Sequence, residues 1–225
     1  MEKGSRAERL VLGIETASKT GSLAILAADV VIAGSEFAAG ETVSELLLPR
    51  IGEMIAEAGR SLLEVDLIAV VTGPGSLTGV RVGLAAAAGL AKGLGVRCAG
   101  VSAFEALLPE TDDGPATLLL VAAGKMVAWE LLRNGERCQD GVCTEEELLV
   151  VIGETEPSRV ICTGDASDKI KDLPSVEVVR NMAIGAARRA QRIASRELAA
   201  SFLKPVYTKG PSFRRVLTDP VDEKM

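Results

Sequence analysis

The 225-residue sequence contains no histidine, and aromatic residues make up only 3% of it. Histidine is the commonest general base, the usual partner of a catalytic serine or cysteine, and a frequent metal ligand. Its absence excludes Ser-His and Cys-His nucleophile pairs and every metal site that needs imidazole. The shortage of aromatic residues also argues against readers of single-stranded nucleic acid, which stack bases on aromatic side chains.

Features of secreted and membrane proteins are also scarce. The charged first nine residues lack the apolar core of a signal peptide. The longest apolar run, residues 82–91, is well short of the roughly 20 residues that span a bilayer. There are four cysteines, Cys98, Cys138, Cys143 and Cys162. They form no Cys-x-x-Cys pair and have no zinc-site spacing. We therefore expect a cytoplasmic protein with reduced cysteines, no metal and no membrane contact.

Charge is distributed unevenly along the chain. The formal net charge is −6, but residues 180–225 alone carry +6. A basic end on an acidic body can meet phosphate or an acidic partner surface. A solvated helix face is the alternative, and the sequence leaves both open.

Alternating apolar runs predict an α/β lobe in the first hundred residues. The expected elements are strands at residues 10–15, 22–27, 30–37, 66–72 and 97–102, and helices at 42–58 and 77–94. The first three strands should form an antiparallel meander, because only short turns join them. Thr42 with Glu45 predicts a capping box, Gly59 a helix end, and Pro49 a kink or the true first turn.

The second half reads as a looser version of the first. The polar, proline-flanked residues 109–115 predict a boundary, giving a lobe at 1–108 and a smaller lobe at 109–225. Strands are expected at residues 117–122, 126–132, 160–162 and 176–179, with helices from about Thr144 and at 181–202. The last residues, which contain three prolines, should be extended and irregular.

Residues 73–76 (Gly-Pro-Gly-Ser) precede the second helix. The backbone amides of such a loop can cradle a phosphate, so Gly73, Gly75 and Ser76 are candidate cofactor-binding residues. The loop lacks the Lys-Ser/Thr of a P-loop and the glycine spacing of a dinucleotide fold. A plain tight turn is the alternative. Glu15, beside Thr16 and Ser18, could hold a metal or orient a phosphate, or could be a solvated loop acid.

The helix at residues 77–94 has two apolar faces where a helix covering a sheet needs one. One face holds Leu77, Val80, Leu84, Ala88 and Ala91, and its neighbour holds Gly79, Gly83, Ala86, Leu90 and Leu94. Each glycine inside a helix costs up to about 1 kcal/mol relative to alanine. Close approach of a partner helix would compensate for this cost, and burial within the chain is the alternative. The remaining acidic groups, at 112–113, 145–147 and 165–168, are most simply surface charge or acids at helix N-termini.

Several segments resemble the TsaB (YeaZ) family of tRNA threonylcarbamoyladenosine synthesis. They are Ile14-Glu15-Thr16, Ser22-Leu23-Ala24, residues 44–49 (SELLLP), residues 73–81 (GPGSLTGVR), residues 101–107 and, less strongly, residues 203–207. The resemblance implies a two-lobed α/β fold of the actin-like ATPase (RNase H-like) class with mixed sheets. Residues 122–125 (Ala-Ala-Gly-Lys) depart from the family's Asp-Ala-Arg stretch.

The resemblance also implies a non-catalytic subunit that pairs with TsaD and works with TsaE. Its paired surface would lie on the first two helices, through Leu47, Leu48, Ile51, Ile55, Gly79, Gly83, Ala86 and Leu90. No cofactor of its own is expected. Binding of ATP or ADP at the interface with TsaD is left open, and contact with tRNA would be only indirect. The alternatives are a glycoprotease-type peptidase, which the missing histidines oppose, an independent kinase or ATPase, and a homodimer through the same helices.

Overall fold

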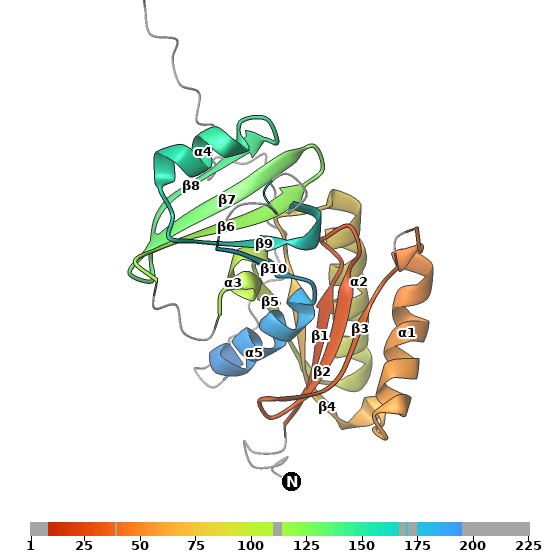
Figure 1. Ribbon diagram of the computed structural model, residues 1–225. Coiled ribbons are helices and arrows are strands. Elements are labelled where there is room, and N and C mark those ends of the chain that lie inside the picture. The colour runs from red at the N-terminus through yellow and green to blue at the C-terminus, as the bar shows by residue number, and fades with distance from the viewer. Residues whose placement is uncertain (1–8, 39, 110–113, 167–169, 171–174, 195–225) are drawn as a thin grey trace, which may run out of the picture.

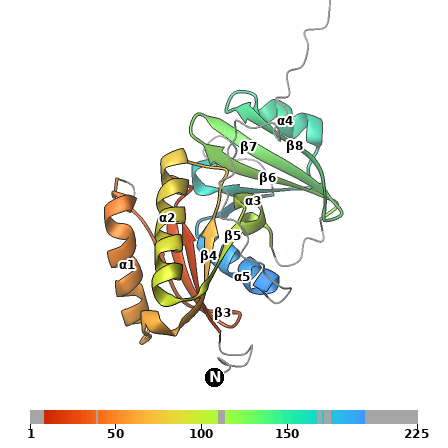
Figure 2. The same ribbon diagram turned by 180° about the vertical axis from the view of Figure 1, so that it is seen from behind.

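The computed structural model describes residues 9–38, 40–109, 114–166, 170 and 175–194, and it consists of two mixed sheets with helices between and outside them (Figures 1 and 2). The first sheet has the order β3-β2-β1-β4-β5. Its strands are β1 (Leu10–Glu15), β2 (Ser22–Ala27), β3 (Val30–Glu36), β4 (Val65–Val71) and β5 (Arg97–Val101). The antiparallel meander β1–β3 and the order of strands and helices are as the sequence predicts.

The second sheet repeats this arrangement. Its order is β10-β9-β6-β7-β8. The strands are β6 (Ala116–Ala123), β7 (Met126–Arg133), β8 (Glu136–Thr144), β9 (Arg159–Thr163) and β10 (Val176–Val179). In each sheet a three-stranded antiparallel meander is followed by two parallel strands. This duplication confirms the two-lobed α/β class with mixed sheets. Strand β8 was not predicted.

Helices α1 (Val43–Glu57) and α2 (Leu77–Leu94) cover the outer face of the first sheet (Figure 1). Helix α1 continues through Pro49. The capping box expected at Thr42 is wrong, because its side chain makes no cap hydrogen bond. The amides of Glu45 and Leu46 instead donate to the carbonyl oxygen of Thr42 at 3.0 and 3.2 Å.

Helices α3 (Ala103–Leu107) and α5 (Met182–Ala194) lie between the two sheets. One hydrophobic core joins the inner faces of both sheets through these helices. The alanine-rich side of α5 packs very closely on β1. A Cβ at Gly13 of β1 would lie only 2.3 Å from the carbonyl oxygen of Ala183. The α5 residues buried in this core are Met182, Ala183, Ala186, Ala187 and Ala190.

Asn181 fixes the start of α5. Its side-chain oxygen accepts from the amide of Ile184, and its side-chain nitrogen donates to the carbonyl oxygen of Leu23 on β2. A helix from the second half of the chain therefore packs on the first sheet. The predicted boundary at residues 108/109 separates the two sheets in sequence. It does not separate the helices that cover them, because α5 follows the boundary and packs on the first sheet. The boundary therefore stays a prediction.

The remaining helix, α4 (Leu148–Thr155), covers the outer face of the second sheet (Figure 1). The helix expected from about Thr144 starts at Leu148, and Thr144 and Glu147 form reciprocal hydrogen bonds just before it. Residues 195–202 of the predicted last helix, and residues 203–225, lie outside the described residues.

Candidate functional site

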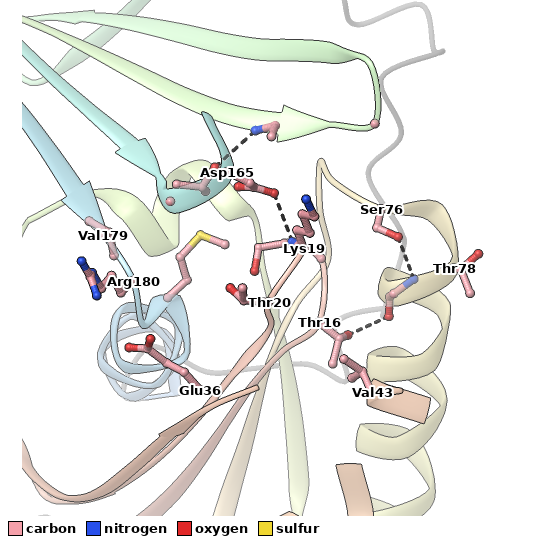
Figure 3. A pocket seen from close by; sticks show the side chains of 18 of the residues that line it. Thr16, Lys19, Thr20, Glu36, Val43, Ser76, Thr78, Asp165, Val179 and Arg180 are labelled. Atoms are coloured by element: carbon pink, nitrogen blue, oxygen red, sulfur yellow. Dashed lines mark hydrogen bonds between the residues drawn. The ribbon is translucent and has the colours of Figure 1, made fainter. Parts of the chain in front are cut away.

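The glycine-rich loop packs against the turn that follows β1. Gly73 is buried. The amide of Ser76 donates to the carbonyl oxygen of Ala17 at 2.7 Å, and a Cβ at Gly75 would lie 2.4 Å from the same oxygen. The hydroxyl of Ser76 accepts from the amide of Gly79 at 3.2 Å and caps α2 (Figure 3). The three candidate cofactor-binding residues are thus engaged within the chain, which favours the tight turn.

Glu15 is fully buried at the end of β1. Its carboxylate accepts from the amide of Ser18 at 2.6 Å, from the Ser18 hydroxyl at 2.8 Å and from the Ser22 hydroxyl at 3.2 Å. Burial raises the pKa of Glu15, and these hydrogen bonds offset the rise only in part. The Ser22 hydroxyl also accepts from the amide of Ala183 in α5. The solvated-acid alternative is therefore wrong, since Glu15 is a buried polar centre that ties β1, β2 and α5 together.

A cavity of about 900 Å³ lies between the two sheets, beside the starts of α1 and α2 (Figure 3). The amide of Lys19 donates to Oδ2 of Asp165 at 3.1 Å and links the two lobes there. Lys19 and Arg180 bring positive charge to the lining, and Glu36 and Asp165 bring negative charge. Asp165, expected to be surface charge or an acid at a helix N-terminus, lies in the first turn of a short 3-10 helix and also makes an interlobe contact.

Metal ligation finds no support in the described ranges, where no three His, Cys, Asp or Glu side chains gather around a common point. Of the acidic groups noted in the sequence, residues 112–113 and 168 lie outside those ranges.

Five of the eight expected interface residues point into the chain. Leu47, Ile51 and Ile55 are 1–2% exposed and belong to the core between α1, α2 and the first sheet. A Cβ at Gly79 would lie 1.8 Å from the carbonyl oxygen of Thr16, and a Cβ at Gly83 would lie 2.3 Å from the Thr16 hydroxyl. These two glycines admit the turn after β1, so the expectation that they admit a partner helix is wrong.

The other three expected residues lie at or beside the surface. Leu48 is 54% exposed, while Ala86 and Leu90 are half-buried. The same two helices also expose a set of small and apolar residues, which we call the outer helix face. It comprises Leu48, Gly52, Ala56, Ala85, Ala88 and Gly89. The sequence spacing places Ala85, Ala88 and Gly89 on one side of the helix. The close contact of Thr16 with α2, which turns Gly79 and Gly83 inward, could not be seen in the sequence.

Helix α2 has unusually little polar surface for a helix on the outside of a sheet. Only 28% of its residues are buried, and by length and composition alone it could cross a membrane. Sheet-covering helices of soluble proteins can pass the same test, and α2 packs on β4 and β1. Its exposed apolar side is the surface that needs an explanation.

Comparison with known proteins identifies relatives. The family model described as "TsaD: tRNA N6-adenosine threonylcarbamoyltransferase" matches residues 38–209. The TsaB protein of Escherichia coli (strain K12) is 29% identical over 143 residues, which cover 63% of this chain and 62% of that one. The tRNA N6-adenosine threonylcarbamoyltransferase of Jannaschia sp. is 49% identical over 77 residues, 32% of this chain and 21% of that one. These matches span less than two thirds of either relative.

The fold agrees with these matches. A Pseudomonas aeruginosa protein described as similar to peptidase YEAZ superposes with a TM-score of 0.67 at 22% identity, covering 89% of this chain and 100% of that one. The family model covers most of the chain, and the motifs at residues 44–49 and 73–81 lie within the residues that it matches. The chain therefore belongs to the TsaB (YeaZ) family, whose members are related to the threonylcarbamoyltransferase TsaD.

Proposed function

We propose that this chain serves tRNA threonylcarbamoyladenosine synthesis in the cytoplasm as a subunit that binds TsaD through the outer helix face, with TsaE as a third component. The observation that carries the proposal is the exposed apolar side of α2 beside Leu48 of α1. An apolar surface of this kind on a soluble protein marks a contact with another protein. The names of the relatives supply the pathway.

The subunit is proposed to act without chemistry of its own. The carboxylate of Glu15 is already occupied by Ser18 and Ser22, and the amide of Ser76 by Ala17. An independent kinase or ATPase would need the Glu15 carboxylate and the Ser76 amide to bind its ligand. Both groups are instead directed into the chain by these contacts. A peptidase of the metal-dependent type would need histidines that the sequence does not contain. ATP or ADP at the interface with TsaD, and indirect contact with tRNA, belong to the same proposal.

Co-purification with TsaD tests the proposal with matched variants. Leu48→Glu on α1 and Gly89→Glu on α2 place charge on the outer helix face, and a side chain at Gly89 meets open space. Both variants should fold but no longer co-purify with TsaD. The controls Leu149→Glu and Gly153→Glu make the same changes at exposed positions of α4 and should keep it. Retention of TsaD by both α1/α2 variants would contradict the assigned surface.

Titration of the isolated chain with ATP and magnesium tests the proposal that the subunit has no chemistry of its own. The proposal expects no heat of binding. Tight binding by the chain alone would instead support an independent ATPase or kinase.

A further inference from the structure

Helix α4 exposes an apolar strip on the outside of the second sheet. Leu149 and Val150 are 57% and 55% exposed, and Gly153, one turn further along the helix, is exposed beside them. We call these three residues the α4 strip. The opposite side of the helix is buried, because Leu148 and Val151 belong to the core of the second lobe. Two large apolar side chains next to each other on an outer helix are typical of a surface that binds another segment.

The charges of α4 and its flanks are all acidic. Residues 145–156 contain five glutamates and no basic residue. Glu146, Glu154 and Glu156 are exposed, and none of the three forms an ion pair with another described residue. Arg133 of β7 lies at the end of the helix, where it donates to a backbone carbonyl oxygen. Helix α2 differs, since it carries two basic residues and no acid. The α4 strip therefore fits a cover that is both apolar and basic.

The chain itself contains a segment with these properties. Residues 203–217, which lie outside the described residues, have no acidic residue. The segment is also long enough to reach α4. Eighteen residues lead from Ala194, the end of α5, to Ser212, and extended chain of that length spans up to about 60 Å. A folded chain of this size is only about 45 Å across. The basic residues of the segment are Lys204, Lys209, Arg214 and Arg215, and the apolar ones are Leu203, Val206, Tyr207, Phe213, Val216 and Leu217.

We propose that residues 203–217 dock on the α4 strip of the same chain. Their apolar side chains cover Leu149 and Val150, and their basic side chains face the exposed glutamates on either side. The basic end and the acidic body of the chain are then two halves of one contact, and the four basic charges are withheld from phosphate. Helix α4 lies away from α1 and α2 (Figures 1 and 2), so docking leaves the outer helix face open.

Carbodiimide cross-linking of the full chain tests the proposal, because it joins a lysine only to a carboxylate in contact with it. Mass spectrometry should find Lys204 or Lys209 joined to a glutamate of residues 145–156. The yield should fall at least about five-fold in roughly 0.5 M salt, which screens exposed ion pairs. In an equal mixture of isotope-labelled and unlabelled protein, both ends of each cross-link should carry the same label. Cross-links between the two labels would contradict docking within one chain.

Trypsin measures how often the segment is released, because cleavage after Lys209 or Arg214 requires the undocked state. The variant E146Q/E154Q/E156Q removes three charges from the rim of the α4 strip and creates no new trypsin site. It should be cleaved in the segment at least about five-fold faster than the wild type, since each exposed pair contributes up to about 1 kcal/mol.

Matched variants on α1 provide the controls. E45Q/E53Q/E57Q also neutralises three exposed acids, and it should be cleaved at the wild-type rate. L149Q should speed cleavage, whereas L48Q, at a leucine of similar exposure, should not. Equal cleavage of the wild type and both α4 variants would overturn the proposal. Cross-links from the two lysines to α1 as abundant as those to α4 would also overturn it.

Discussion

Two glycines in helix α2 should respond in opposite directions to the same substitution. Replacing an exposed helical glycine by alanine stabilises a protein by up to about 1 kcal/mol. Gly89 has nothing within 4 Å of its ideal Cβ position, so Gly89→Ala should gain that amount. At Gly79 the same Cβ would lie 1.8 Å from the carbonyl oxygen of Thr16, a backbone atom that cannot rotate away.

The cost at Gly79 can be weighed against this gain. Overpacking a tight contact costs about 1–3 kcal/mol, and a clash with backbone belongs at the upper end. After the gain in helix propensity, Gly79→Ala should lower the free energy of unfolding by about 2 kcal/mol. The effect of Gly83→Ala on the free energy of unfolding should lie between those of Gly89→Ala and Gly79→Ala. The neighbour of its Cβ is the Thr16 hydroxyl, which can rotate away. That rotation breaks the 2.7 Å hydrogen bond from the hydroxyl to the carbonyl oxygen of Gly79.

Thermal and urea unfolding of the three variants measure this order. A difference of about 3 kcal/mol between Gly89→Ala and Gly79→Ala corresponds to midpoints about 6–12 °C apart for a chain of this size. The fluorescence of Trp129, in the second sheet, gives a probe remote from all three sites. Equal stability of Gly79→Ala and Gly89→Ala would refute the close approach of Thr16 to α2.

Three further predictions concern other parts of the chain. Because burial raises the pKa of Glu15, the folded protein holds that proton more tightly than the unfolded chain. Its contribution to stability therefore falls as pH rises above the ordinary value of 4.5, and urea titrations of Glu15→Gln at several pH values should lack this fall. Gly185→Ala should loosen α5 and speed its hydrogen exchange, because its Cβ would lie 2.0 Å from the carbonyl oxygen of Ala106. Iodoacetamide at pH 8 should modify Cys138 first by peptide mass mapping, since it is the exposed thiol. Burial raises the pKa of the other thiols to about 12 for Cys98 and Cys162 and about 11 for Cys143.

The five strands and the two outer helices of the first lobe could be predicted from sequence almost to the residue, because its strands are short apolar runs between clear turns, but the short helix α3 was not predicted. The strands at 10–15 and 22–27 and the helix at 77–94 have the predicted bounds. Strand β8 could not be predicted in this way, since it starts with exposed polar residues and lacks an apolar run. The repeat of the first lobe in the second was the available signal. Each meander has three strands, and β8 is the third of its set.

The candidate surface was predicted at the level of helices but not of residues. Periodicity shows that α2 has two apolar faces, yet it cannot tell which face meets the turn after β1. That contact depends on Thr16, more than sixty residues earlier in the chain. For the same reason Glu15 could not be recognised as buried, because the Ser22 hydroxyl that donates to it accepts in turn from the amide of Ala183, in a helix that starts at residue 182.

The position of α5 has a consequence for how this protein is made. The inner face of the first sheet, with Val11, Leu26 and Leu67, is covered by the last described helix. During synthesis that face stays uncovered until residues 182–194 have left the ribosome, so the first lobe cannot complete its fold as it emerges. A chain interrupted before residue 182 would present this apolar sheet to chaperones and proteases, and a fragment of residues 1–108 would aggregate on expression.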